Sequence, residues 1–219
     1  MTPTLSDADL QRIREAVATA ETQTAGEIVP YVVGRSGSYD VAVWRGASVA
    51  AVLAMLSGMI VAALYDGWGL GWLYTGWGMV LVALTAGALG ALATAYVPAL
   101  MRLLAGDGLL TLNTHRRAMQ AFVEEEVFDT RDRTGILLFV SMLEHRIEVY
   151  GDAGINAKVD QSDWAEVVAR VRKGIVEQRF ADGMVDAIAL CGELLHRRGV
   201  EIRPDDTDEL SDNVRLRDE

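Results

Sequence analysis

Four acidic side chains stand at the ends of the strands that the sequence predicts, and they are its main candidates for chemistry. Glu27 opens the first predicted strand, and Asp152 follows a predicted β-hairpin. Asp129 and Asp132 lie in the turn before a buried strand. Ligands of α/β sheets tend to collect at strand ends, and carboxylate oxygens are the ligands that Ca²⁺ and Mg²⁺ take. The pattern therefore indicates a divalent metal site.

The same carboxylates have a structural alternative. Glu27 and Asp152 could cap helices or form ion pairs with Arg131 or Arg133. The spacing of the EF-hand calcium loop is absent, and no group of His and Cys residues has the spacing of a zinc site. The sequence leaves both roles open and names no certain cofactor.

Three other side chains with reactive chemistry lie in settings that favour a structural role. His145 falls in a predicted hairpin turn, where an exposed turn residue is the simpler interpretation. Ser141 ends a buried strand without the strand-to-helix elbow of a hydrolase nucleophile. Cys191 lies on the apolar face of a predicted helix, as a packing thiol does. The catalytic residues are therefore unknown from the sequence.

An α/β domain has to position these residues, and its elements follow from hydrophobic periodicity. Ser6 is a plausible N-cap for the first helix, and the run TGILLFVSM at 134–142 has the continuous apolar character of a strand buried on both faces. The fold class is α/β, a small mixed sheet sandwiched by helices. The predicted helices are 6–24, 113–128, a helix capped by Asp163 or Ser162, and 180–198. The predicted strands are 27–34, 134–142 and 147–150.

Two segments of this domain carry specific expectations. Pro30 lies inside the first strand and cannot donate a backbone hydrogen bond, so this strand is predicted to be an edge strand or to be bulged there. Residues 201–219 are rich in charge and show no core pattern, and they are predicted to be a disordered acidic tail.

An apolar insertion interrupts the domain after its first strand. Between Arg45 and Arg102 the one charged residue is Asp66. Residues 46–65 form a run of 20 residues without charge, which spans about 30 Å as a helix, the thickness of a bilayer core. A second span is predicted at 77–97. Small residues recur every fourth position in both spans, for example Gly46, Ala50 and Gly87, which favours close packing of a helical hairpin.

Basic residues predict the orientation of this hairpin. Arginines flank the two spans, whereas the connecting loop has none. By the positive-inside rule both termini and the soluble domain face the cytoplasm. The expected location is the plasma or inner membrane, with two spans. The flanking arginines are Arg35, Arg45, Arg102, Arg116 and Arg117.

Charge and cysteine content limit the classes of partner. The formal net charge of −11 argues against sequence-independent binding of nucleic acid, whose affinity comes from neutralising phosphates. The single cysteine, Cys191, forms no internal disulfide. The expected partners are the lipid bilayer and a membrane protein; the sequence does not set the oligomeric state.

Several short motifs of the α/β domain form one set. They are Thr24-Ala25-Gly26-Glu27-Ile28-Val29, Ala118, Phe122, Thr134-Gly135-Ile136-Leu137, Ser141, Asp152, Gly154-Ile155 and Trp164. Together they resemble the TPM domain family, in the branch with a transmembrane hairpin inserted in the domain. The resemblance covers about residues 6–198. It implies a TPM fold, and it implies calcium binding, weak acid phosphatase activity or a role in assembling membrane complexes, each described for some members.

The function predicted from these features is that of an interaction or accessory factor at the membrane, tuned by a divalent cation. The alternative is a weak metal-dependent phosphatase. An enzyme normally gathers polar residues around an identifiable nucleophile or base, and the sequence shows none. The predicted divisions are 1–44 and 102–200 for the two parts of the domain, 45–101 for the hairpin and 201–219 for the tail.

Overall fold

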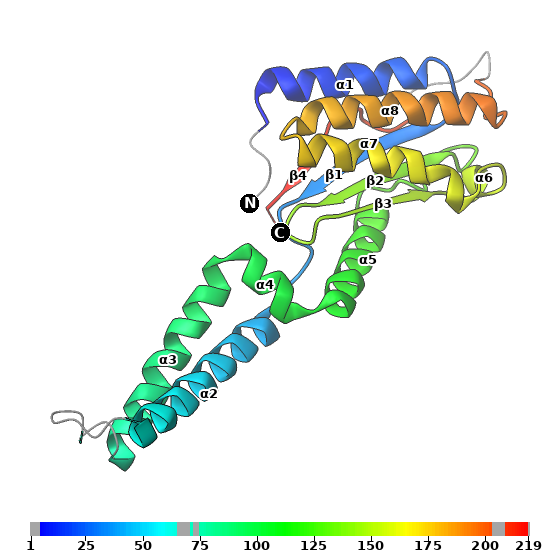
Figure 1. Ribbon diagram of the computed structural model, residues 1–219. Helices are drawn as coiled ribbons and strands as arrows, with labels where there is room; N and C mark the ends of the chain where they lie inside the picture. Colours follow the sequence, from blue (N-terminus) through cyan, green and yellow to red (C-terminus); the bar gives the residue numbers. More distant parts are fainter. Residues whose placement is uncertain (1–4, 65–70, 72–74, 203–208, 219) are drawn as a thin grey trace. The chain divides into compact units, whose positions relative to one another are not determined.

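The computed structural model describes residues 5–64, 71, 75–202 and 209–218. The chain forms two compact units: one combines Met1–Gly37 with Thr111–Glu219, and the other is Ser38–Leu110. The first unit is an α/β domain assembled from both ends of the chain. The second consists of helices (Figure 1).

A four-stranded mixed sheet organises the first unit, in the order β3-β2-β1-β4. The central strands β1 (Glu27–Val33) and β2 (Gly135–Ser141) pair in parallel from Glu27↔Gly135 to Val33↔Ser141. β3 (Arg146–Gly151) runs antiparallel to β2, and β4 (Arg215–Arg217) runs parallel to β1. The predicted class, a mixed sheet with helices on its faces, is confirmed.

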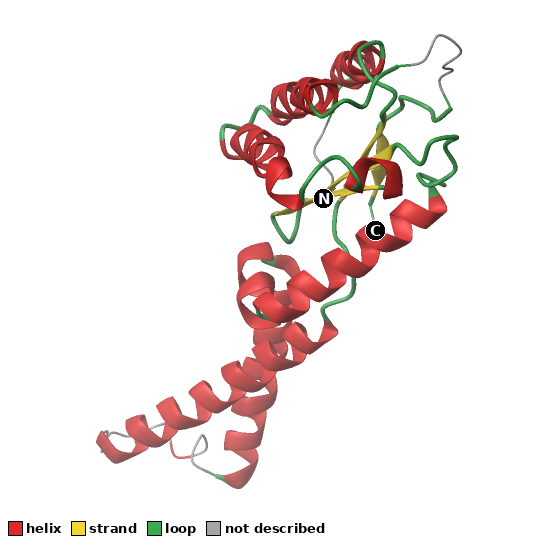
Figure 2. Cartoon of the chain, turned by 90° about the vertical axis from the view of Figure 1, so that its right-hand side faces the viewer, coloured by secondary structure: helices red, strands yellow, loops and turns green. Residues whose placement is uncertain are grey.

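Helices cover both faces of the sheet, which explains why every residue of β1 and β2 is buried. Figures 1 and 2 show α1 (Asp7–Glu21), α7 (Trp164–Val176) and α8 (Phe180–Arg197) side by side over one face. α5 (Asp107–Glu124) covers the other. Successive strand residues point to opposite faces, so two apolar layers form. One contains Ile28, Val32 and Leu138 with α1, α7 and α8; the other contains Val29, Tyr31 and Phe139 with Ala118 and Ala121 of α5.

The helix starts agree with the local signals in the sequence. Ser6 caps α1 through a reciprocal capping box with Asp9, which satisfies backbone N–H groups that have no partner within the helix. Among the described residues, two short α-helices were not predicted. α6 (Ala153–Asn156) lies inside the predicted loop after β3, and α4 (Pro98–Ala105) directly follows the second long helix.

Pro30 is accommodated by the short length of β4. The N–H of Glu27 points to β2, because it donates to the Thr134 carbonyl at 3.2 Å. Backbone groups alternate in direction along a strand, so the N–H that Pro30 lacks would point to the β4 side. β4 pairs with β1 only from Tyr31 onward. β1 is therefore an edge strand up to Pro30 and an interior strand after it, without a bulge in its register with β2.

The predicted disordered tail is partly wrong. Residues 203–208 and 219 lie outside the described residues, but Arg215–Arg217 form β4. Arg215 Nε lies 3.0 Å from a carboxylate oxygen of Glu125, and both side chains are mostly buried. The side chains of Val214 and Leu216 pack against the apolar layer under α1, α7 and α8. The pairing with β1 and the ion pair order a segment whose own sequence has no core pattern.

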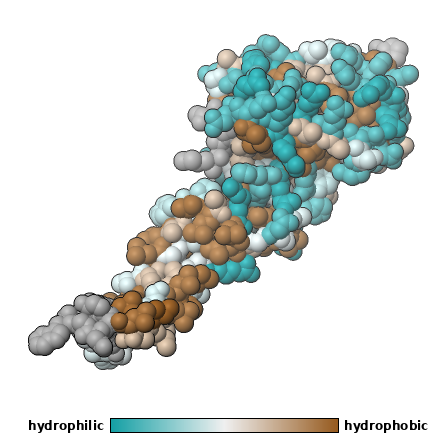
Figure 3. Space-filling view, viewed as in Figure 1, coloured by the Kyte–Doolittle hydropathy of each residue, from teal (hydrophilic) through white to brown (hydrophobic). Residues whose placement is uncertain are grey.

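The second unit is a helical hairpin. α2 (Asp40–Leu64) and α3 (Gly76–Tyr96) correspond to the predicted spans 46–65 and 77–97, except that Tyr65 lies outside the described residues. Both are long and apolar enough to cross a membrane, as judged by length and composition. Figure 3 shows hydrophobic residues over these helices. Arg45 of α2 donates to the carbonyls of Leu104 and Ala105 at the end of α4, at 2.7 and 3.1 Å.

Small residues let α2 and α3 approach closely, as their spacing predicts. A Cβ on Gly90 would lie 2.5 Å from Ala50 Cβ and 2.6 Å from the Gly46 carbonyl oxygen. A Cβ on Gly46 would lie 1.9 Å from Thr94 Oγ1. The contact on α3 thus uses Gly90 and Thr94 in addition to the predicted position Gly87.

We predict that Gly90→Ala destabilises the hairpin by about 1–3 kcal/mol, because the added methyl group overpacks a helix contact made of backbone. Gly76→Ala is the matched control, since a Cβ there would have no neighbour within 4 Å. Denaturant titration of the full chain in mild detergent measures the difference. Equal unfolding midpoints for the two variants would contradict the close packing.

Candidate functional site

The predicted metal residues lie at the amino end of the parallel strands. Asp152 is the N-cap of α6, accepts the N–H of Ala153 at 2.7 Å, and lies 2.6 Å from Arg133 Nε through its other carboxylate oxygen. It therefore both caps a helix and forms an ion pair, the two roles of the structural alternative. Gly154 brings α6 against the preceding turn, where a Cβ would lie 2.3 Å from the carbonyl oxygen of Asp132.

Glu27 connects the same end of the sheet to the C-terminal segment. Its side chain is 7% exposed, and its two carboxylate oxygens accept the N–H groups of Glu209 and Leu210 at 3.4 Å each. Asp129 and Asp132 are exposed in the turn before β2. Among the residues that the structure describes, no three His, Cys, Asp or Glu side chains gather into a metal-binding group. Ca²⁺ or Mg²⁺ binding by these four carboxylates stays a prediction.

The opposite, carboxyl end of the parallel strands holds a buried polar network that the sequence did not reveal. Ser141 at the end of β2 donates its hydroxyl to Glu144, and its Oγ lies 2.6 Å from Ser36 Oγ. The N–H of Ser36 donates to the second oxygen of Glu144 at 2.8 Å. All three side chains are buried. Ligands usually enter at this end of an α/β sheet, and here these three buried residues bond to one another.

The other reactive residues have the structural roles that the sequence favours. His145 is exposed in the β2–β3 turn with a φ of 54°. Cys191 is fully buried in the layer of α8, and burial raises the pKa of its thiol to about 12. The thiolate that nucleophilic chemistry needs is therefore not formed at neutral pH.

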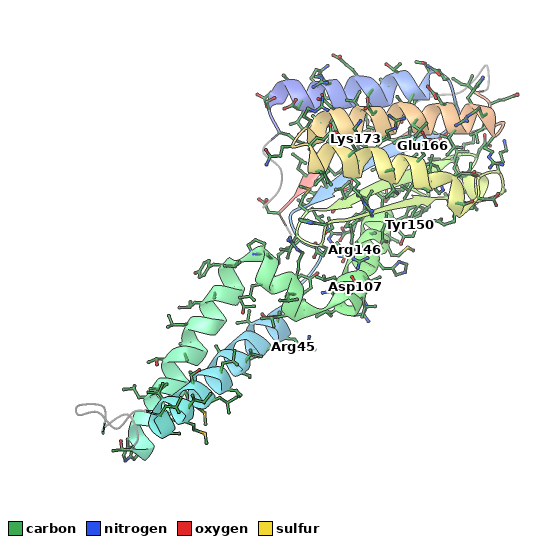
Figure 4. All side chains as sticks on the ribbon, in the orientation of Figure 1. Arg45, Asp107, Arg146, Tyr150, Glu166 and Lys173 are labelled. Atoms are coloured by element: carbon green, nitrogen blue, oxygen red, sulfur yellow. The ribbon has the colours of Figure 1, made fainter. Side chains whose placement is uncertain are left out.

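An open groove runs along the outer edge of the sheet, and it is the candidate functional site. The groove has a volume of about 780 Å³, with β3 as its floor, α7 as one wall, and Thr111 and His115 of α5 as the other. Figure 4 labels Tyr150 on β3 and Lys173 on α7. Its lining also includes Ile147, Val149, Ala165, Val168, Ala169 and Arg172.

A hydrogen-bonded cluster lines the α5 side of this groove. Tyr150 donates its hydroxyl to Glu148, and His115 Nδ1 lies 2.7 Å from the same hydroxyl oxygen. Burial and the contact with Glu148 raise the pKa of Tyr150, so the hydroxyl stays protonated. Because that proton goes to Glu148, the hydroxyl accepts from His115, which orients the imidazole. Sequence reasoning missed His115, and the spacing of Glu148 and Tyr150 on one face of a strand was the available signal.

Comparison with known proteins agrees with this architecture. The family model of the TPM domain matches residues 104–194. The NMR structure of the BA42 protein from the psychrophilic bacterium Bizionia argentinensis superposes with a TM-score of 0.58. The match covers 97% of this chain and 95% of BA42 at 18% sequence identity, and so it concerns the fold. No curated protein matches the sequence.

The fold is that of an α/β protein, and the TPM domain model matches its segment from residue 104 to residue 194. This segment contains the motifs around Gly135 and Asp152 that carry the resemblance to that family. The two long apolar helices α2 and α3 lie between β1 and β2 in the chain order, where the resemblance places an inserted hairpin.

We predict that Asp152→Ala lowers the free energy of unfolding by about 0.5–2 kcal/mol, the usual cost of losing an N-cap. Asp129→Ala is the control, because its exposed side chain forms no such cap. Thermal unfolding of the full chain in detergent, with EDTA and with millimolar Ca²⁺, measures both. The structural role predicts the same loss in the two solutions. A metal site predicts instead a melting temperature that rises with Ca²⁺ in the wild type and in neither variant.

Proposed function

We propose that this protein is integrated in a membrane through α2 and α3, and that its TPM domain acts there as an interaction or accessory factor. The observation that carries the proposal is the exposure of large apolar side chains along both helices, such as Met59 at 62%, Leu84 at 67% and Leu89 at 67%. Water would solvate such surfaces at a cost of about 25 cal/mol per Å², whereas hydrocarbon accepts them.

The exposure separates these helices from other apolar helices of similar length. A core helix of a soluble protein is buried by its neighbours. Here none of the residues in the most apolar 18-residue stretch of α2 is buried, and 11% of those in the corresponding stretch of α3 are buried. Helices also satisfy their own backbone hydrogen bonds, as the interior of a bilayer requires. Two spans return the chain to the side from which it entered, so both halves of the TPM domain can fold together.

Basic residues support a cytoplasmic domain. Arg45 lies in the first turns of α2, and Arg102 follows α3 in α4, so both lie at the end of the hairpin that is joined to the domain. The positive-inside rule places that end in the cytoplasm.

We predict that a reporter fused after Glu219 is active in the cytoplasm and that the full chain stays in the membrane pellet after alkaline extraction. A chain lacking 38–110 is the control and is expected in the supernatant. Activity of the reporter on the outer side would contradict the orientation, and release of the full chain by alkali would contradict the integration.

The accessible groove at the edge of the domain supports the interaction role. The carboxyl end of the sheet is filled by Ser36, Ser141 and Glu144, while the edge groove at β3 is accessible. A weak metal-dependent phosphatase is the rival activity, and it would use the carboxylates at the amino end. A divalent ion would tune the accessory role through the same carboxylates, which the calcium arm of the unfolding experiment tests.

A phosphatase assay discriminates between these functions. The accessory role predicts the same background hydrolysis of p-nitrophenyl phosphate with Mg²⁺ or Ca²⁺ by the wild type, Glu27→Ala and Asp152→Asn. Asparagine is used because it caps a helix as well as aspartate does. A loss of turnover in both variants, with their folding retained, would favour the phosphatase.

A further inference from the structure

The open edge of the TPM sheet has the geometry of a binding site for an extended polypeptide. We propose that the groove along β3 binds a segment of a partner protein as a fifth strand, with apolar side chains alternating with polar ones and an acidic residue among them. The proposal rests on the interaction role above and names the partner chemistry of that role.

Backbone groups of β3 point into the groove. Asp152 donates its N–H to the carbonyl of Gly135 in β2 at 2.8 Å. Since direction alternates along a strand, Ile147, Val149 and Gly151 turn their backbone groups away from β2. The carbonyl of Gly151 accepts from Asn156 Nδ2 at 2.6 Å, which ends the open stretch. Within the described part of the chain, no backbone hydrogen bond joins Ile147 or Val149 to an outer strand.

The two walls differ in chemistry, and this difference sets the pattern of the ligand. The α7 wall offers exposed Ala165 and Ala169, one helical turn apart, beside Val168. The α5 wall offers His115 and the Tyr150 hydroxyl. Side chains of a bound strand alternate between the two walls. Apolar residues of the ligand therefore fit against α7 and polar ones against α5, as in other cases of strand addition to a sheet edge.

The charges around the groove favour an acidic residue in the ligand. Glu148 accepts from Tyr150, and Glu177 is paired with Arg179 and lies 3.9 Å from Lys173. Arg172 is exposed and, within the described residues, has no carboxylate partner. A guanidinium binds a carboxylate through paired hydrogen bonds. Arg172 thus supplies a cation for an acidic side chain of the partner.

Two other occupants fit less well. The C-terminal strand of this chain already pairs with β1, at the opposite edge of the sheet. A second copy that presented its own β3 would bring its own α7 and α5 to the same edge, so four walls would have to share the space that two line here. A single extended segment enters between the walls without this conflict.

The test uses the full chain in detergent micelles and a fluorescein-labelled peptide in which valine alternates with threonine and aspartate. A peptide of the same composition with its valines adjacent is the sequence control. Fluorescence polarisation measures the dissociation constants. The proposal predicts that the alternating peptide binds at least about tenfold more tightly, a difference of about 1.4 kcal/mol.

Variants of the groove locate the binding. Ala169→Trp fills the α7 side and is expected to weaken binding at least tenfold, while Ala18→Trp on the exposed side of α1 leaves it unchanged. Arg172→Gln should weaken binding several-fold and reduce its salt dependence. Hydrogen exchange followed by NMR reports the backbone pairing: the amides of Ile147 and Val149 gain protection with the peptide, and those of Glu148 and Tyr150 are protected without it.

Three results would overturn the proposal. They are equal affinity of the two peptides, unchanged binding by Ala169→Trp, and protection of Ile147 and Val149 that rises with protein concentration without peptide, which would assign the edge to a second copy. The membrane role fails separately, through release of the chain by alkali. A chain that stays in the membrane but binds neither peptide would retain the proposed location and lose this ligand.

Discussion

The parallel pairing of β1 with β2 is the interaction on which the rest of the structure depends. These strands are separated in the sequence by the whole helical hairpin, yet they pair residue for residue from Glu27↔Gly135 to Val33↔Ser141. Both apolar layers are built on them, and every one of their residues is buried. A Cβ on Gly37 would lie 2.8 Å from Asn113 Nδ2. The chain therefore leaves the α/β unit and returns to it at neighbouring points. The insertion must therefore return the chain to its starting place, which the hairpin of α2 and α3 does.

This constraint determines which parts of the domain remain available for function. Both faces of the sheet are covered by helices. At the amino end Asp152 is occupied by α6 and Arg133, and at the carboxyl end Glu144 is occupied by Ser36 and Ser141. The edge at β1 is filled by β4. The edge at β3 keeps outward backbone groups together with an open groove, which is why we assign the interaction there.

The features that depend on local sequence signals could be predicted. Those that form only when segments distant in the sequence come together could not. The apolar run of β2, the Ser6 cap and the two long helices follow from composition, periodicity and length. β4 was missed because Arg215-Leu216-Arg217 is short and charged, and its order comes from β1 and Glu125. The groove was missed because it is formed by β3, α7 and α5 together, and the sequence of any one of these segments does not indicate that the three lie side by side. The emphasis on Glu27 and Asp152 followed from the rule about strand ends. That rule concerns the carboxyl ends, whereas these residues lie at the amino end.

The central claim is that one α/β domain, closed by the β1–β2 pairing, is interrupted by a hairpin that we propose to lie in hydrocarbon. Size-exclusion chromatography without detergent tests it most directly, comparing the full chain with a chain in which residues 38–110 are replaced by a short Gly-Ser linker. The linker is expected to suffice because Gly37 and Asn113 are neighbours. The account predicts a compact, soluble monomer for the linked chain and aggregation for the full chain. A full chain that elutes as a soluble monomer, or a linked chain that elutes as an unfolded or aggregated species, would contradict it.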